Sequence, residues 1–216
     1  MTFADFIDFF LHAERHLEWF IKNYDFWIYA LLFAIIFCET GLIVTPFLPG
    51  DSLLFAVGAL AGKQLIQVEI VTPLLLVAAI IGDAVNYSIG KWMGPKVFQY
   101  ESNRFLNKAH LMKAHEFYER YGGRAIILAR FVPIVRTFAP FVAGVGSMTY
   151  SKFALYNVSG AFLWVGIFLG GGYYFGGLEV VQKNMKLVIL GIIVVSILPI
   201  VWEFAKAWLE KRKSAQ

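Results

Sequence analysis

Five ionisable residues lie inside long apolar stretches of this chain, and they are the first candidates for chemistry. Residues 26–62 contain only two charges, residues 70–90 contain one and residues 125–151 contain two: Glu39, Asp51, Asp83, Arg130 and Arg136. A charge at the centre of a membrane helix costs about 2.5–3.5 kcal/mol on insertion scales. Such residues therefore pair with one another, face a polar cavity or take part in transport.

The two arginines suggest an anion as ligand. Arg130 and Arg136 are permanently charged, and each can donate two parallel hydrogen bonds to a phosphate. Glu39 and Asp51 are carboxyl groups that can take up or release a proton in a low-dielectric site. We expect the arginines to bind the substrate and the two acids to couple its binding to protons. The alternative is that the four residues only form ion pairs between the two halves of the chain, although hydrophobic side chains often serve that purpose equally well.

Further polar residues share helix faces with these charges. Asp83, Asn86 and Tyr87 are spaced i, i+3 and i+4, so they lie on one face of a helix. A similar face is formed by Asn157, Gly160, Ala161 and Trp164, and glycines at 170–172 and 176–177 permit close helix packing. We interpret both faces mainly as packing surfaces that support the site.

Two apolar segments are unsuited to simple spans. Residues 52–62 provide only 11 uncharged residues before Lys63, too few to cross a bilayer. Residues 125–151 contain two arginines and two prolines, and a broken backbone at membrane depth must be buried in protein or line a cavity. We predict re-entrant hairpins at about residues 46–65 and 125–150. Their expected breaks are at Pro46 and Pro49, where Gly50 follows, and at Pro133 and Pro140.

Pro133 has an additional expected role. It lies between Arg130 and Arg136, so a helix broken there could direct a half-helix end towards an anion.

Composition places these segments in a membrane. The chain is 59% hydrophobic and 16% charged, with a mean hydropathy of +0.65, which is more apolar surface than a soluble core of 216 residues can bury. We predict an all-α polytopic membrane protein with about four transmembrane helices, two opposed re-entrant hairpins and interfacial amphipathic helices. The expected spans are residues 26–45, 70–90, 153–178 and 187–202.

The distribution of basic residues predicts the orientation. The connector 91–124 holds seven basic residues and three acids, and the tail 206–216 is also basic, so both should be cytoplasmic. Both termini then lie in the cytoplasm, and the hairpins enter from opposite sides as an inverted repeat would require. Phe55-x-x-Gly58 and Phe141-x-x-Gly144 are weak sequence support for that repeat. Chance similarity in an apolar chain is the alternative.

The remaining segments predict contact with the membrane surface. Residues 1–25 read as an amphipathic interfacial helix, which we expect to be retained uncleaved, before a membrane domain at 26–205. The connector 91–124 reads as a pair of interfacial helices near anionic headgroups. We expect no nucleic-acid partner, no cofactor and no metal, because the basic residues flank membrane segments and the four histidines (His12, His16, His110 and His115) show no metal-site spacing. Oligomeric state is left open, and a homo-oligomer is one option.

Four motifs together resemble the bacterial DedA family, which shares the VTT or SNARE-associated domain. They are Phe37-Cys-Glu-Thr-Gly41, Pro46-Phe-Leu-Pro-Gly-Asp-Ser-Leu-Leu54, Gly82-Asp-x-x-Asn-Tyr-x-x-Gly-Lys91 and Arg130-Phe-Val-Pro-x-x-Arg-Thr-x-x-Pro-x-x-Ala-Gly144. The resemblance extends from about residue 20 to residue 205. Lys91 replaces an arginine that is often found there, and the charge is kept.

This resemblance implies a bacterial inner-membrane protein with two opposed hairpins. Some family members move undecaprenyl phosphate or phosphatidylethanolamine across the membrane, and others are linked to proton motive force or drug tolerance. The family's functional residues match Glu39, Asp51, Arg130 and Arg136. We therefore predict a flippase or scramblase for phosphate-bearing lipids, with lipids and protons as partners. The alternative is a proton-coupled antiporter of small cations or drugs, whereas an enzyme is disfavoured because no catalytic motif occurs.

Overall fold

The computed structural model describes residues 17, 26–42, 50–94, 108–185, 187–192 and 194. These residues form helices and connecting turns, and no strand occurs among them, which confirms the all-α prediction for this part of the chain. The helices are α3 (Trp27–Gly41), α4 (Gly50–Gly62), α5 (Val68–Met93), α6 (Lys108–Tyr121), the 3-10 turn η2 (Gly122–Arg124), α7 (Ala125–Ala129), α8 (Pro133–Val145), α9 (Tyr150–Phe175) and α10 (Glu179–Lys183).

Two helices are long and apolar enough to cross a bilayer. Helices α5 and α9 have 26 residues each, which corresponds to about 39 Å of helix. Only 33% and 39% of their most apolar windows are buried, so most residues of these windows are at least partly exposed, as with Phe162 and Ile167 on α9. These helices confirm the predicted spans at 70–90 and 153–178. Lipid is the solvent that such outward faces require.

Three further apolar helices have about half that length. Helix α3 has 15 residues, and α4 and α8 have 13 each. The predicted span at 26–45 corresponds to α3, which ends at Gly41. The re-entrant course of the two hairpins remains a prediction.

Several predictions fall outside the described residues. Among these are most of the N-terminal helix at 1–25, the breaks at Pro46 and Pro49, residues 95–107 of the connector 91–124, His12 and His16, and the tail 206–216. Of the predicted fourth span at 187–202, only residues 187–192 and 194 are described, and they are helical. In the connector, residues 108–121 form helix α6, and its interfacial position remains a prediction.

The two predicted proline breaks in the second hairpin have different outcomes. The backbone is extended at Val132 (φ −122°, ψ 101°), and α8 begins at Pro133, so the chain is broken between the two arginines as expected. The break predicted at Pro140 is wrong, because α8 continues through Pro140 to Val145. One missing backbone hydrogen bond is tolerated in a helix that neighbouring helices surround.

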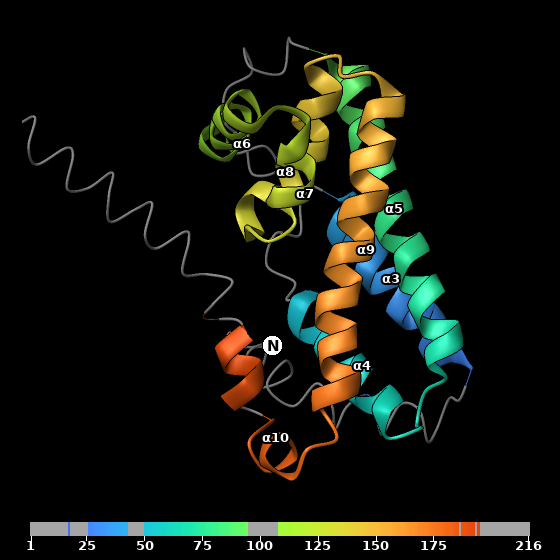
Figure 1. Cartoon of the computed structure of the whole chain (residues 1–216). Helices are drawn as coiled ribbons and strands as arrows, with labels where there is room; N and C mark the ends of the chain where they lie inside the picture. The colour runs from blue at the N-terminus through green and yellow to red at the C-terminus, as the bar shows by residue number, and fades with distance from the viewer. Residues whose placement is uncertain are drawn as a thin grey trace, which may run out of the picture.

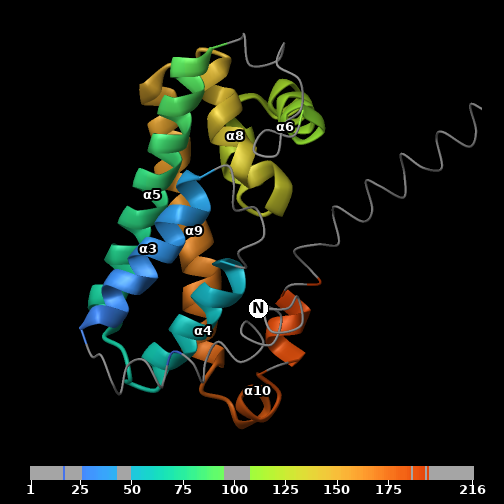
Figure 2. The same ribbon diagram turned by 180° about the vertical axis from the view of Figure 1, so that it is seen from behind.

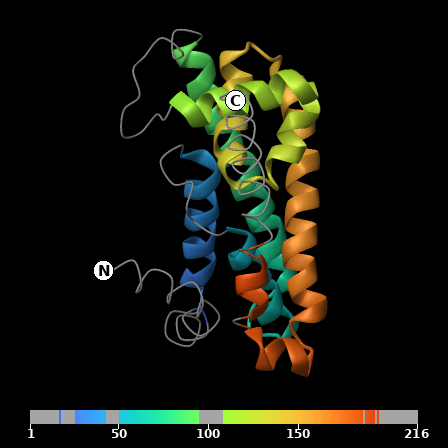
Figure 3. The ribbon, with the colours of Figure 1, turned by 90° about the vertical axis from the view of Figure 1, so that its left-hand side faces the viewer.

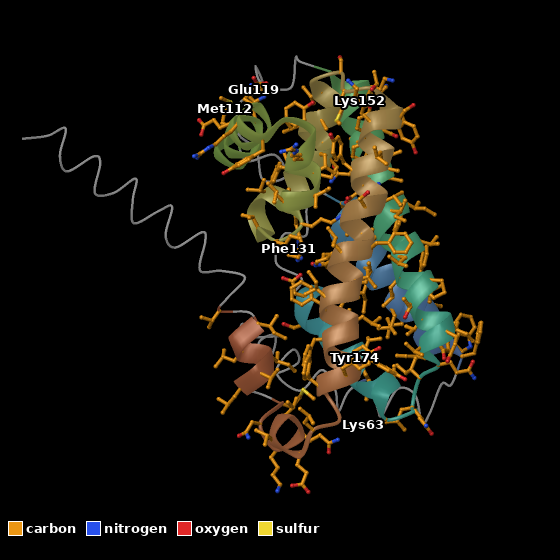
Figure 4. All side chains as sticks on the ribbon, viewed as in Figure 1. Lys63, Met112, Glu119, Phe131, Lys152 and Tyr174 are labelled. Atoms are coloured by element: carbon orange, nitrogen blue, oxygen red, sulfur yellow. The ribbon has the colours of Figure 1, made fainter. Side chains whose placement is uncertain are left out.

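The short helices occupy opposite ends of the two long ones. Helices α5 and α9 run the length of the molecule, with α3 and α4 along its lower half and α7 and α8 along its upper half (Figures 1 and 2). Viewed from the side, α3 and α9 lie at the two edges, with α8 above α4 between them (Figure 3). Among the side chains, Phe131 in the turn before α8 lies at mid-height, between Lys152 at one end and Lys63 at the other (Figure 4).

The short helices of both halves pack on the two long helices. Helix α3 packs mainly against α5, and α7 packs mainly against α9, in each case the long helix that follows in the chain. Helices α4 and α8 have the exchanged arrangement, because α4 packs mainly against α9 and α8 mainly against α5.

Glycines allow the backbones of α4 and α9 to approach each other closely. A Cβ atom built on Gly58 would lie 2.0 Å from the carbonyl oxygen of Leu169. A Cβ atom on Gly172 would lie 2.0 Å from the carbonyl oxygen of Phe55. Glycine is therefore required on both helices where they cross. The predicted packing role of the glycine cluster at 170–177 holds only in part, since Gly170 and Gly177 have open space around them.

The α8–α5 contact is built in the same way. A Cβ atom on Gly144 would lie 2.1 Å from the carbonyl oxygen of Tyr87, and one on Gly90 would lie 2.1 Å from that of Phe141. Phe55-x-x-Gly58 and Phe141-x-x-Gly144 thus occupy equivalent places in two similar crossings. This equivalence is what the predicted inverted repeat requires.

Candidate functional site

Arg136 joins the two hairpins through buried ion pairs. It lies in the first turns of α8, where its backbone N–H donates to the carbonyl of Val132 (2.9 Å). Its Nη1 donates to Oδ1 of Asp51 on α4 (2.8 Å), and its Nη2 donates to Oε1 of Glu39 near the end of α3. The side chain of Arg136 is 9% exposed, and those of Asp51 and Glu39 are 7% and 1% exposed. One guanidinium group therefore holds the two predicted proton-coupling carboxylates.

Gly50 makes room for the Glu39 side chain. The backbone N–H of Gly50, the first residue of α4, donates to Oε1 of Glu39 (3.0 Å). A Cβ atom on Gly50 would lie 1.9 Å from Oε2 of Glu39, so a side chain there would displace the carboxylate. Within the described residues, that Oε2 atom is buried and has no hydrogen-bond partner.

Arg130 forms a second pair with residues of the long helices. It lies in the turn that ends α7, and its Nη2 donates to Oδ2 of Asp83 on α5 (2.6 Å) and to Oδ1 of Asn157 on α9 (2.6 Å). Asn157 is oriented by its own amide, which donates to the carbonyl of Ile80 (3.0 Å). Asp83 and Asn157 are thus direct partners of Arg130.

Asn86 and Tyr87 connect the hairpins to α5. The amide of Asn86 donates to the carbonyl of Thr40 at the end of α3 (3.2 Å) and to that of Thr137 on α8 (2.7 Å). The hydroxyl of Tyr87 donates to the carbonyl of Met148, just before α9. Both residues therefore link α5 to neighbouring segments beside the cluster, and their supporting role in function remains a prediction.

Trp164 touches both ion-pair groups, and sequence reasoning treated it only as a packing residue. Its indole Nε1 donates to Oδ1 of Asp51 (2.8 Å), the same oxygen that accepts from Arg136. Its ring centroid lies 5.7 Å from Cζ of Arg136 and 5.9 Å from Cζ of Arg130, within the range of cation–π contact. Its spacing of seven residues from Asn157 was the available signal, because residues i and i+7 share a helix face.

The two arginine groups surround one small cavity. Its volume is about 10 Å³, and it is lined by Thr40, Asp83, Arg130, Arg136 and Trp164. This volume is at the threshold for a single water molecule. The structure is therefore a closed state with respect to any larger ligand.

The charges around this cavity do not balance. Three carboxylates face two guanidinium groups, so the fully ionised cluster has a net charge of −1. Removing one partner of a buried ion pair costs about 3–5 kcal/mol, because the other charge is left without compensation. The cluster can therefore open only if a proton, a cation or another anion replaces a broken pair.

The predicted site residues mostly come together. Glu39, Asp51, Asp83, Arg130 and Arg136 form this cluster, with Asn157 bonded to it and Asn86 and Tyr87 beside it. Gly50 contacts Glu39, and Pro133 starts the helix that carries Arg136. Pro49 lies outside the described residues. Each arginine pairs with different acids, and the sequence did not predict this pairing. The roles of these residues in binding remain predictions.

Among the described residues, no group of three or more histidine, cysteine, aspartate or glutamate side chains is arranged to hold a metal ion.

Long apolar spans, half-length helices and a buried ion-pair cluster together define a polytopic α-helical membrane protein. The VTT domain matches residues 48–174, which is more than half of the chain. The chain is 56% identical over 212 residues to "Protein DedA" of Escherichia coli K12, covering 97% of this chain and 95% of that protein. The chain therefore belongs to the DedA family.

Other relatives carry less specific names. The "Uncharacterized membrane protein Rv0364" of Mycobacterium tuberculosis H37Rv is 39% identical over 188 residues, covering 86% of this chain and 82% of that protein. The "Inner membrane protein YqjA" of Escherichia coli K12 is 35% identical over 156 residues, covering 72% and 71%. No solved structure matches the chain significantly. Membrane localisation is thus supported by the relatives as well as by α5 and α9.

Proposed function

We propose that this protein is a carrier that moves phosphate-bearing lipids across the bacterial inner membrane. Arg130 and Arg136 bind the headgroup phosphate in place of their carboxylate partners. Protonation of Glu39 and Asp51 releases Arg136 for this purpose. Both termini and the connector 91–124 lie in the cytoplasm.

The observation that carries the proposal is the pairing of two buried guanidinium groups around one cavity. A phosphate offers the same kind of oxygen acceptors as the carboxylates that now occupy these donors. When Glu39 and Asp51 are protonated, a phosphate on Arg136 leaves neither the arginine nor these two acids charged without a partner, which keeps the energetic cost of the exchange low.

The position of the cluster favours a lipid headgroup. Asp83 and Trp164 lie in the middle parts of the two helices that can span the bilayer, and substrate sites of transporters commonly lie near the midplane between repeats. The outer faces of α9 are apolar, with Leu155, Phe162 and Ile167 exposed, so a lipid tail can stay in the bilayer while its headgroup crosses through the protein.

The test compares binding and transport among acid and arginine variants. Glu39→Gln and Asp51→Asn imitate the protonated state, so they should keep or increase binding of lipid phosphate and lose the pH dependence of transport. Arg130→Ala and Arg136→Ala should lose binding itself. Binding is measured with purified protein, and transport in liposomes with undecaprenyl phosphate or phosphatidylethanolamine at several pH values.

A matched control is the exposed ion pair of α10, in which Lys183 lies 3.3 Å from Glu179 and both side chains are more than 70% exposed. Lys183→Gln removes a basic partner without touching the cluster and should leave transport unchanged. If the acid variants transport with an unchanged pH dependence, Glu39 and Asp51 are structural partners and the proton-linked mechanism is wrong.

The net charge of −1 supports a second candidate, a proton-coupled antiporter of small cations or drugs. In that function the carboxylates bind the cation and the arginines only balance charge. Arg136→Lys keeps the charge but loses the planar pair of donors. A carrier of phosphate should therefore fail with lysine, and an antiporter should continue to work.

A further inference from the structure

Trp164 is an uncharged residue at the centre of the charged cluster. It lies on α9, is 1% exposed, and contacts groups from three other parts of the chain. Its N–H donates to Asp51, which belongs to the first hairpin, and its ring lies near Arg130 and Arg136, which belong to the second.

Electrostatic repulsion favours separation of the guanidinium groups of Arg130 and Arg136. They carry like charges and line the same cavity of about 10 Å³. Their carboxylate partners hold them towards different elements, because Asp83 is on α5 whereas Asp51 is on α4. The negative face of an indole ring attracts a cation, and indole is the best of the aromatic side chains in this respect. One ring near both cations therefore counteracts their repulsion.

The hydrogen bond of Trp164 fixes the ring relative to Asp51. An indole has a single N–H donor, and this donor is used at 2.8 Å on a carboxylate oxygen. The helices that carry the two residues, α9 and α4, are also in backbone contact at Gly58 and Gly172. The ring of Trp164 and Asp51 consequently keep a fixed relative position. Arg136 can break its ion pair with Asp51 and bind a ligand while these two residues stay in place.

We propose that Trp164 is a positioning residue that joins the two arginines into a single phosphate site. Its ring keeps both guanidinium groups directed at the same cavity after their carboxylates are exchanged for a phosphate. This inference rests on the proposed function, since it assigns the positioning of the headgroup ligands named there. Trp164 acts through Arg130 and Arg136 and not by direct contact with the substrate.

The first experiment uses the natural fluorescence of Trp164. The other five tryptophans (Trp19, Trp27, Trp92, Trp202 and Trp208) are replaced by phenylalanine, so that emission reports only on Trp164. Short-chain phosphatidic acid is added to the purified protein, with diacylglycerol of the same chains as the control that lacks phosphate. We expect a saturable change with phosphatidic acid and none with diacylglycerol, because only a phosphate moves the two cations near the ring.

The second experiment measures apparent affinity in liposomes. Trp164→Leu removes the aromatic face and should weaken the apparent affinity for phosphatidic acid about tenfold. Trp164→Phe keeps a weaker face and should lose less. Phe153→Leu is the matched control, because Phe153 is a fully buried aromatic residue of the same helix that stacks on Tyr87 and does not touch the arginines.

A double-mutant cycle separates positioning from simple core packing. If Trp164 acts through Arg130, the combination of Trp164→Leu with Arg130→Gln should weaken affinity by much less than the product of the two single effects. Independent effects, or a Trp164 emission that phosphatidic acid does not change, would overturn the inference while leaving the carrier intact. An emission change with inorganic phosphate but not with phosphatidic acid would keep Trp164 at an anion site and refute the lipid carrier.

Discussion

Replacing Gly172 by alanine should destabilise the protein, whereas the same replacement at Gly170, two residues away on α9, should not. At Gly172 the new Cβ atom would lie 2.0 Å from the carbonyl oxygen of Phe55 and 3.0 Å from the backbone nitrogen of Ala59. Both contacts are with the backbone of α4, so no side-chain rotation can relieve them. Because carbon–oxygen contacts normally begin near 3.3 Å, α4 must move by about 1 Å.

The expected magnitude follows from two opposing terms. Overpacking of this kind typically costs about 1–3 kcal/mol. Alanine also favours a helix over glycine by about 0.8–1.0 kcal/mol, and this gain applies at both positions. A Cβ atom on Gly170 meets no atom within 4 Å, so Gly170→Ala retains the gain alone. The two variants should therefore differ by about 1–3 kcal/mol, with Gly172→Ala the less stable.

The measurement is thermal unfolding of both purified variants in the same detergent or lipid disc, followed by circular dichroism. For a chain of this size, 1 kcal/mol corresponds to about 2–4 °C in Tm, so the difference should be about 2–12 °C. Gly172→Ala should also reduce transport, because α4 carries Asp51. Equal Tm values for the two variants would refute the close approach of α4 and α9 on which the described fold depends.

Three further outcomes test the site and the topology. Arg136→Lys should abolish transport, measured in liposomes, because one ammonium group cannot replace both bonds of the guanidinium; retained transport would favour the antiporter. Gly50→Ala should reproduce the transport defect of Glu39→Ala, since its Cβ atom would lie 1.9 Å from Oε2 of Glu39; normal transport would show that this carboxylate is not needed in place. Reporter fusions near Lys108 and Lys63 should read cytoplasmic and periplasmic, and a cytoplasmic signal at Lys63 would exclude the predicted first hairpin.

The sequence predicts the membrane helices and the charged cluster for simple physical reasons. Apolar length identifies α5 and α9, because an uncharged stretch of about 20 residues has few uses other than crossing a bilayer. Charges within such stretches must meet partners, so the presence of Asp83 and Arg136 in them predicts a cluster. These arguments depend on composition along the chain and need no knowledge of helix crossings.

The pairing inside the cluster could not be predicted in the same way. Arg136 takes Glu39 and Asp51, whereas Arg130 takes Asp83, and this choice depends on where the helices cross. The crossings are set by glycine contacts such as that of Gly144 on α8 with Tyr87 on α5, and the sequence does not distinguish these glycines from one with open space around it, such as Gly170. Trp164 was missed for a related reason, since an aromatic residue in an apolar helix normally indicates packing.

The exchanged packing of the hairpins has a consequence for how the site can open. The glycine crossings hold α4 to α9 and α8 to α5 as two backbone-contacting pairs. Any motion that separates these pairs must break the bond between Arg136 and Asp51, while the bond between Trp164 and Asp51 lies within one pair and can persist. Breaking that ion pair without a replacement costs about 3–5 kcal/mol. An empty, fully ionised carrier should therefore stay closed, and a proton on Asp51 together with a phosphate on Arg136 removes the cost that keeps it closed.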